Sequence, residues 1–460
     1  MDERKKRYSV LASIMLGSIM GPIDASIINV ALPTITQSFG VGIATAQWVS
    51  MIYLLSISSL LLFYGRLGDI VGYKKVYLSG LAGFVIASIF CGFAPTAHSL
   101  IFFRAIQGLV AGMMMAVPFA IIMAIFPASE RGKVLGINAI SISAGLAIGP
   151  SLGGFLTSYL GWRSVFFLNI PIGCMALFWG YRIIPELKGH PGKMDIPGVV
   201  TGSTALTAIL LLLNRLQSTG FDFLAIVIFL LAAISSVLFI LIEQKAVNPM
   251  LNLTLFQNRT FSFANISALL NYMAQYVMVF LTPFYLQRVL LYAPNQVGLV
   301  MTAFPFTVMA VAPISGSLSD RIGTRILAFL GAGICALSLF FMHQLSVTSQ
   351  PSEVVWRLML FGVGNGIFQS PNNSAVMGSV PRPYLGIASG VLATMRNVGM
   401  VMGVAAGGAI LYAFVPFHTL QGATFGGMEK VLFLSGLRHA YLAGAIIAAV
   451  ASLSSLMRNR

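Results

Sequence analysis

The sequence contains very little charge. Only 8% of its 460 residues are Asp, Glu, Lys or Arg, whereas about a quarter are charged in a typical soluble domain. Hydrophobic residues make up 57% of the chain. This composition excludes an ordinary water-soluble domain and predicts an all-α polytopic membrane protein. The 46 glycines and 20 prolines fit that class, because membrane helices tolerate both residues.

Residues that hold metals and cofactors are also scarce. The three cysteines, Cys91, Cys174 and Cys335, lie on separate apolar segments without CxxC spacing, so neither a disulfide framework nor a zinc site is expected. No GxxxxGK[ST] loop is present, which argues against ATP as the energy source. We expect no metal and no cofactor. A membrane enzyme is disfavoured because the sequence shows no paired carboxylates and no His cluster.

The basic residues mark topology. The formal net charge is +15, yet the 27 Lys and Arg lie almost wholly between apolar segments. If the amino end MDERKKR is cytoplasmic, 19 of them fall on the cytoplasmic side, 5 outside and 3 within helices, as the positive-inside rule requires. The sequence therefore predicts a protein of the cytoplasmic membrane with both termini in the cytoplasm, and no nucleic-acid partner. The first apolar run is too long for a signal peptide, so we expect an uncleaved helix.

Fourteen apolar segments are long enough to cross a bilayer as helices, since each crossing needs about 20 residues. The expected spans are 8–30, 46–64, 76–94, 99–125, 136–158, 164–181, 197–215, 223–242, 261–286, 297–318, 326–344, 354–377, 387–413 and 437–457.

An internal repeat divides these segments. GRLGDIVG at 65–72 and GSLSDRIG at 316–323 share the pattern GxLxDxxG. Each copy is expected to follow an inward-running helix and to open a short basic loop. Duplicated halves are typical of secondary transporters. The repeat predicts fourteen helices arranged 6+2+6, as a six-helix half over 1–190, a two-helix insert over 191–258 and a second six-helix half over 259–460.

Asp24 is the one acidic residue that the sequence places deep in the bilayer. A charged side chain there costs about 3 kcal/mol on insertion scales, so we predict a site that binds and releases a proton. A hydrogen-bonded packing residue is the alternative. Arg104 is expected at the same depth, from the 1.5 Å rise per helical residue, and Gln107 is placed to hold its guanidinium. For Arg104 the alternative is a structural salt bridge.

Small residues recur at helical spacing in two segments. Such residues let helices touch without side chains between them, and a proline there bends the helix. We predict a tight seam between the two halves, with plain helix packing as the alternative. The residues concerned are Gly145, Gly149, Pro150, Gly153 and Gly154 in the fifth span, and Gly399, Gly403 and Gly407 in the thirteenth.

Polar side chains share single helix faces in the second half. Asn271 and Gln275 are four residues apart, as are Asn365 and Gln369, which places each pair on one face. These faces are predicted to line a substrate cavity, with interhelical hydrogen bonding as the alternative. The candidate cavity residues are Asn271, Tyr272, Gln275, Asn365, Gln369 and Arg396.

Taken together, the motifs resemble a known family. The chain resembles transporters of the major facilitator superfamily, specifically the fourteen-helix drug:proton antiporter branch, over essentially its whole length. GRLGDIVGYKK is similar to the family's loop 2–3 signature, RAIQG to its fourth-helix signature and GLAIGPSLGG to its antiporter signature. GPIDASIINVALP and GWRSVFFLNIPIG resemble the fourteen-helix branch in particular.

The resemblance implies roles for individual residues. Asp24 would be the proton or cation site, with Arg104 and Gln107 beside it. Tyr73 departs from the family pattern, which usually has a basic residue there, so a charge relay through this position is not expected. The implied cytoplasmic gate comprises Gly65, Asp69, Gly72, Lys74, Asp320 and Arg321.

The expected function is multidrug efflux, the proton-coupled export of hydrophobic, cationic drugs or amphipathic compounds by alternating access. The alternative is an exporter or flippase for lipids or amphipathic metabolites. Expected partners are a small hydrophobic or cationic substrate, protons and membrane lipids, with the chain acting as a monomer and not as an enzyme.

Overall fold

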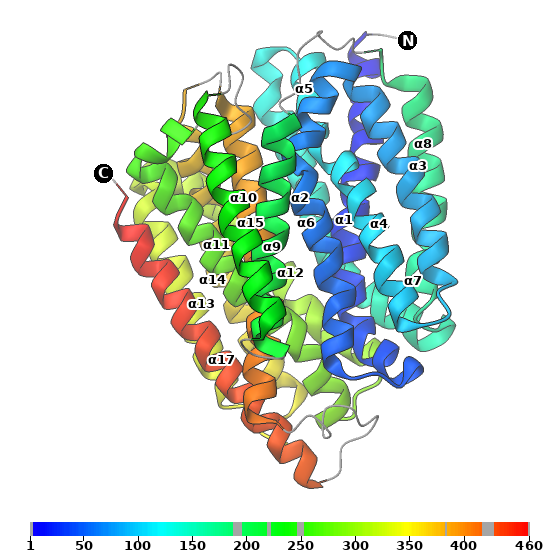
Figure 1. The fold of residues 1–460 in the computed structure, drawn as a ribbon, viewed down its shortest axis with the longest axis vertical. Coiled ribbons are helices and arrows are strands. Elements are labelled where there is room, and N and C mark those ends of the chain that lie inside the picture. Colours follow the sequence, from blue (N-terminus) through cyan, green and yellow to red (C-terminus); the bar gives the residue numbers. More distant parts are fainter. Residues whose placement is uncertain are drawn as a thin grey trace.

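The computed structural model describes residues 3–186, 196–218, 222–245, 253–381, 384–415 and 427–458. Over these residues all regular structure is helical. The long helices run back and forth between two ends of one bundle (Figure 1). We call the end that carries Glu3 and Leu456 the terminal face, and the opposite end, which carries Phe39 and Gly427, the distal face.

The helices follow the expected order of segments. The first part of the chain forms α1 (Glu3–Phe39), α2 (Ile43–Val71), α3 (Tyr73–Gly92), α4 (Ala97–Ala116), α5 (Pro118–Ile125), α6 (Ala128–Leu160), α7 (Ser164–Phe167) and α8 (Asn169–Ile183). The expected insert forms α9 (Ile196–Ser218) and α10 (Phe223–Lys245). The last part forms η1 (Leu253–Gln257), α11 (Arg259–Phe284), η2 (Tyr285–Val289), α12 (Pro294–Ile322), α13 (Thr324–His343), α14 (Pro351–Gly378), α15 (Leu385–Phe414) and α17 (Gly427–Leu456). The expected boundary between residues 190 and 191 lies outside the described residues.

Eleven helical segments in the described part of the chain are long and apolar enough to cross a membrane. The chain is therefore a polytopic membrane protein. The helices α6, α9 and α14 coincide with expected spans but are not among the eleven. In α14 the reason is composition, because Arg357, Asn365 and Gln369 lower its mean hydropathy.

Several helix ends differ from the expected ones. α1 continues to Phe39, well past the expected end at residue 30, although it contains Pro33. Proline removes one backbone donor, and the hydroxyl of Thr36 donates to the carbonyl oxygen of Pro33 at 2.6 Å in the following turn. The single helix expected over 99–125 is divided, because Pro118 begins the separate helix α5.

The two GxLxDxxG repeats lie inside helices and not in loops. The first forms the end of α2 and the second the end of α12. The chain then reverses direction at Gly72 (φ 100°) and at Gly323 (φ 87°). The helix α3 begins directly after Gly72, and α13 begins directly after Gly323. Only glycine adopts such positive φ values at low cost. The expected basic loops are therefore turns of one glycine each.

Helix packing places the two parts of the chain side by side (Figure 1). α1 packs along α6, and α11 packs along α15. Contacts between the two parts are made by α6 with α12 and by α2 with α15. α9 and α10 pack on each other, while α9 also contacts α2 and α15. The predicted insert thus lies against both parts.

Candidate functional site

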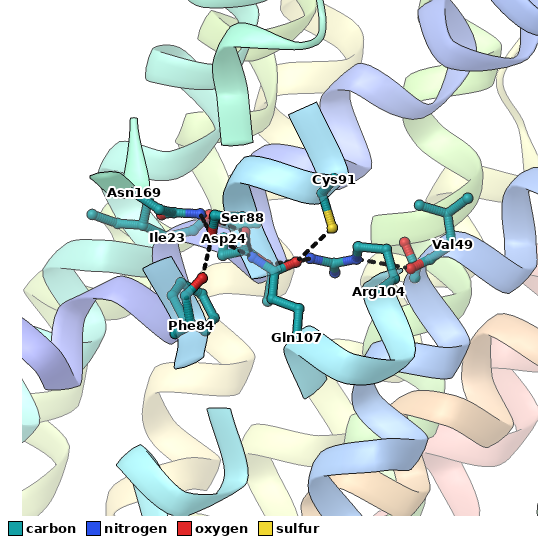
Figure 2. Close-up of polar contacts among 12 residues, drawn as sticks. Ile23, Asp24, Val49, Phe84, Ser88, Cys91, Arg104, Gln107 and Asn169 are labelled. Carbon is teal, nitrogen blue, oxygen red and sulfur yellow. Dashed lines mark hydrogen bonds and ion pairs between the residues drawn. The ribbon is translucent and has the colours of Figure 1, made fainter. Parts of the chain in front are cut away.

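Asp24 is the centre of a buried polar network (Figure 2). Its Oδ2 accepts a hydrogen bond from Nη1 of Arg104 at 2.5 Å, and its Oδ1 accepts from Gln107 at 3.2 Å and from Asn169 at 2.9 Å. The Arg104 and Asp24 side chains are 0% and 3% exposed. The structure thus brings together the three residues singled out in the sequence and adds Asn169.

A second set of contacts fixes this network in place. The hydroxyl of Ser88 accepts from Gln107 at 2.9 Å and donates to the carbonyl oxygen of Phe84 at 2.7 Å. The Nε of Arg104 donates to the carbonyl oxygen of Val49 at 3.1 Å. The network therefore joins α1, α2, α3, α4 and α8. A proton added to Asp24 would neutralise one side of the ion pair and change all of these bonds together.

Asn169, Ser88 and Tyr53 were not singled out as site residues in the sequence. Asn169 lies in the segment GWRSVFFLNIPIG, which was noted only for its resemblance. A polar residue inside an expected span was the available signal for both Asn169 and Ser88. Tyr53 carried no such signal, because a tyrosine in an apolar helix is ordinary core.

A central cavity lies between the two parts of the chain. Its wall is formed by α1, α2, α4 and α6 on one side and by α11, α12, α14 and α15 on the other. It holds about 1230 Å³ of space free of atoms, open solvent at its mouth included. The wall is mainly apolar, with residues such as Leu54, Val279 and Phe304.

Five of the six predicted cavity residues line this space: Tyr272, Gln275, Asn365, Gln369 and Arg396. Asn271 does not line it. It lies behind the wall, where its Nδ2 donates to Oδ1 of Asn365 at 2.8 Å. Asn365 in turn donates to Gln275 at 3.3 Å, and Gln369 donates to the hydroxyl of Tyr272 at 2.7 Å. Gln275, Asn365 and Gln369 thus line the cavity and also form hydrogen bonds between helices.

The structure places Asp24 outside the cavity wall, although its neighbours Ala25 and Ser26 line it. Tyr53 lies between the cavity and the ion pair. Its ring lines the cavity, and the Arg104 Cζ atom is 4.0 Å from the centroid of that ring. A substrate in the cavity would therefore meet Tyr53 and not the carboxylate.

The cavity wall carries a positive charge. Among the residues that line it, all of which are described, Arg396 is the one charged side chain, and no Asp or Glu is present. The acid expected to attract cations is thus buried behind the wall. Glu243 is buried as well, at 4% exposed, but it lies in the last turn of α10 and not deep in the expected span.

At the distal face, α6 and α12 are in direct contact. A Cβ atom on Gly154 would collide with the carbonyl oxygen of Pro294, and one on Gly298 would collide with that of Pro150. Backbone therefore meets backbone at this seam, which we call the distal seam. The hydroxyls of Ser151 and Thr302 form a hydrogen bond across it.

Polar side chains extend the distal seam to other helices. Arg288 donates to the hydroxyl of Thr36 at 2.8 Å, and Gln287 donates to the carbonyl oxygen of Val30 at 3.0 Å. The sequence placed Arg288 in an outer loop, whereas the structure buries it in η2. Gln47 adds a bond from α2 to the carbonyl oxygen of Val404 in α15 at 2.9 Å.

The other glycines predicted for the seam between the halves contact helices of their own part of the chain. Gly145, Gly149 and Gly153 face α1 within the same part of the chain, where Gly149 approaches Ser26 and Gly153 approaches Ile27. Gly399 and Gly403 face α11, and Gly407 faces Leu281 of the same helix. These two glycine stripes are helix-packing surfaces within each part. Of the antiporter-like motif, Pro150, Ser151 and Gly154 contact α12 of the other part.

At the terminal face, the predicted gate residues interact locally. Oδ1 of Asp69 accepts from the hydroxyl of Tyr73 at 2.6 Å, and Oδ2 lies 3.5 Å from Nη1 of Arg66. Tyr73 therefore binds the Asp69 carboxylate by a hydrogen bond, although its side chain is not basic. Lys74 lies 3.8 Å from Glu186. Gly65 lies within α2, Gly72 ends that helix, and Asp320 and Arg321 occupy the last turn of α12.

Over the described residues, no group of three or more His, Cys, Asp or Glu side chains lies together as a metal site requires.

A bundle of apolar helices around a mixed apolar and polar cavity, with a buried ion pair beside it, defines a membrane transporter. The comparisons with known proteins agree. Residues 14–263 and 264–459 each match the sequence pattern of the Major Facilitator Superfamily, and the chain belongs to that family.

Named relatives are transporters. The riboflavin transporter RibZ of Clostridioides difficile is 36% identical over 405 residues, which cover 87% of each chain. The multidrug resistance protein Stp of Mycobacterium tuberculosis is 33% identical over 87% of this chain and 75% of its own length. The multidrug transporter MdtP of Bacillus subtilis is 28% identical over 89% of this chain and 76% of its own length.

The fold agrees with solved structures of low sequence identity. A bacterial homologue of the human lysosomal transporter Spinster, crystallised in an inward-facing and unoccupied conformation, has a TM-score of 0.69 at 17% identity. The match covers 98% of this chain and 96% of that one. It supports the fold and says nothing further about this chain's substrate.

Proposed function

We propose that this protein is a proton-coupled exporter of hydrophobic or amphipathic compounds that works by alternating access. The observation that carries the proposal is the cavity between the two parts of the chain, closed at the distal seam. Such a cavity gives a substrate one binding place that can be exposed to each side in turn. Relatives named as multidrug transporters support the same function.

The proposed topology is fourteen crossings arranged 6+2+6, with residues 1–190 and 259–460 as the halves and 191–258 as the insert. The alternation of α1 to α17 between the two faces supports it. The terminal face would be cytoplasmic and the distal face external, in the cytoplasmic membrane of the cell, because the basic residues favour that orientation. The distal seam would then close the outer side.

Coupling to protons is assigned to Asp24, Arg104 and Gln107. Protonation of Asp24 would weaken its hold on Arg104, whose guanidinium stacks on Tyr53 at the cavity wall. Binding of a proton and binding of a substrate would therefore influence each other through Tyr53. The two ligands would not compete for one carboxylate. Such a linkage needs only that each ligand change the position or charge of a shared group.

Transport in proteoliposomes tests the proposal. The purified protein would be reconstituted, and the uptake of ethidium and of riboflavin would be measured with and without an imposed pH gradient. Gradient-driven accumulation of at least one compound is expected, and it should be lost in Asp24→Asn. The control is Asp222→Asn, which removes an exposed carboxylate that pairs with Arg215 at the distal face. Equal transport with and without the gradient would contradict proton coupling.

A metabolite exporter is the second candidate. The riboflavin transporter among the relatives favours it, as does the amide-rich strip of Gln275, Asn365 and Gln369 in the cavity wall. Accumulation of riboflavin without any accumulation of ethidium in the same vesicles would favour this candidate over multidrug efflux.

A further inference from the structure

We propose that the central cavity selects an aromatic compound whose polar end is anionic or rich in hydrogen-bond acceptors, and that Arg396 binds that end. This inference rests on the proposed transport function and names the substrate class of its cavity. It replaces the cationic substrate expected from the sequence.

Charge is the first argument. Arg396 lines the cavity together with Gln369 and Asn397, and no carboxylate shares the wall with them. A cation inside a membrane protein is costly, so it usually pairs with an acid or serves a function. An unpaired cation in a low-dielectric cavity attracts anions and repels cations over several ångströms. The wall as a whole therefore disfavours a positively charged substrate.

The bonding of Arg396 is the second argument. Its guanidinium forms no hydrogen bond or ion pair with any of the described residues, and its Nε is buried without a partner. By contrast, the guanidinium groups of Arg104 and Arg357 both bond to backbone carbonyl oxygens and to acids. Buried donors are normally paired. Arg396 thus keeps donors for a ligand, and a planar fork of donors suits a carboxylate, a phosphate or adjacent carbonyl groups.

The rest of the wall fits a flat ring. Tyr53, Tyr276 and Phe304 present aromatic side chains to the cavity, and aromatic faces stack on planar ligands. The first part of the chain contributes mostly apolar wall, whereas Arg396 and most amides come from α11, α14 and α15. A bound molecule would place its polar end toward those three helices.

Aromatic faces can also hold cations, so a cationic aromatic substrate is the competing reading. A pair of dyes with one ring system separates the two. Fluorescein is anionic and rhodamine 123, a methyl ester without a free carboxylate, is cationic, while both share a xanthene core. Their binding to the full-length protein in lipid nanodiscs would be measured by fluorescence anisotropy, with riboflavin as a neutral, acceptor-rich competitor.

Three variants complete the experiment. Arg396→Gln removes the charge at similar size, Arg396→Lys keeps the charge without the planar fork, and Arg182→Gln removes an exposed charge at the end of α8. We expect the wild type to bind fluorescein at least tenfold more tightly than rhodamine 123. Arg396→Gln should abolish that preference, Arg396→Lys should keep part of it, and Arg182→Gln should leave it unchanged.

The inference would be overturned by tighter binding of rhodamine 123 than of fluorescein by the wild type, or by an unchanged preference in Arg396→Gln. Failure of all three compounds to bind would overturn it as well. Because the assay reads binding at equilibrium, it is separate from transport. Normal fluorescein binding without transport in vesicles would contradict the proposed function and leave the assignment of Arg396 standing.

Discussion

Tyr53 contacts both the central cavity and Arg104. It is one of the residues that line the cavity, and the guanidinium carbon of Arg104 is 4.0 Å from the centroid of its ring. The arginine in turn holds Asp24. This chain of contacts runs from the cavity wall to the buried carboxylate, and we propose that it couples substrate binding to proton binding.

A first prediction follows for the aromatic ring itself. Tyr53→Leu removes the stacking of Arg104, and a desolvated cation–π contact is worth about 2 kcal/mol. We expect pH-driven transport to fall by on the order of tenfold while substrate binding changes less. Tyr53→Phe keeps the ring and should retain most transport, because the tyrosine hydroxyl has no hydrogen-bond partner among the described residues. Equal losses in both variants would point to the hydroxyl and not to the ring.

The ion pair gives a second prediction. Asp24→Asn leaves the Arg104 charge buried and uncompensated, and breaking such a pair costs about 3–5 kcal/mol of stability. The thermal unfolding temperature of the purified protein should therefore fall. The double variant Asp24→Asn with Arg104→Gln should recover much of that stability but not the pH-driven transport. Recovery of transport in the double variant would show that the pair serves the fold alone.

A third prediction concerns Asp69 at the terminal face. Asp69→Asn removes the charge that faces Arg66 and weakens the bond from Tyr73. We expect slower turnover with nearly unchanged substrate binding, since Asp69 is not among the residues that line the cavity. Tyr73→Phe should have a smaller effect, because one hydrogen bond is worth about 1 kcal/mol. Loss of binding in a well-folded Asp69→Asn protein would refute the gate assignment.

The distal seam gives a fourth prediction. Gly298→Ala inserts a methyl group against the backbone of Pro150 and should hold α6 and α12 apart. A single cysteine introduced at Ser151 should then react faster with a membrane-impermeant maleimide. Gly378→Ala is the matched control, because a Cβ atom there meets nothing within 4 Å. Unchanged labelling in Gly298→Ala would mean that the seam does not control access.

The orientation in the membrane gives a fifth prediction. A cysteine at Asp222, between α9 and α10, should be labelled only from outside the cell, and one at Lys245, at the end of α10, only from the cytoplasm. The two positions lie at opposite ends of one helix of 23 residues. Labelling of both from the same side would rule out a membrane crossing by α10.

Much of this arrangement could be predicted from periodicity and depth. The helical rise placed Asp24 and Arg104 at one level, and the structure pairs them. Spacing of four residues also put Gln275 and Gln369 on faces that line the cavity. These predictions needed only the geometry of a single helix.

Other features depended on how the helices turn toward each other. Residue spacing cannot tell which side of α1 meets the cavity, so Asp24 was expected to meet the substrate although Ala25 and Ser26 line the wall instead. Likewise, the glycine stripes showed that close contacts exist but not with which helix. Gly153 faces α1 while its neighbour Gly154 faces α12, because adjacent residues on a helix point about 100° apart.

The distal seam also has a thermodynamic consequence. Backbone meets backbone at Gly154 and Gly298, and the nearby hydroxyls of Ser151, Ser158 and Thr302 can bond to water once the seam parts. Opening therefore exposes little hydrocarbon, and exposure of hydrocarbon is what raises heat capacity. The enthalpy of opening at this seam is expected to stay almost constant with temperature. A van't Hoff plot of the opening equilibrium should therefore be nearly straight, whereas the plot for a gate of interlocked apolar side chains would be curved.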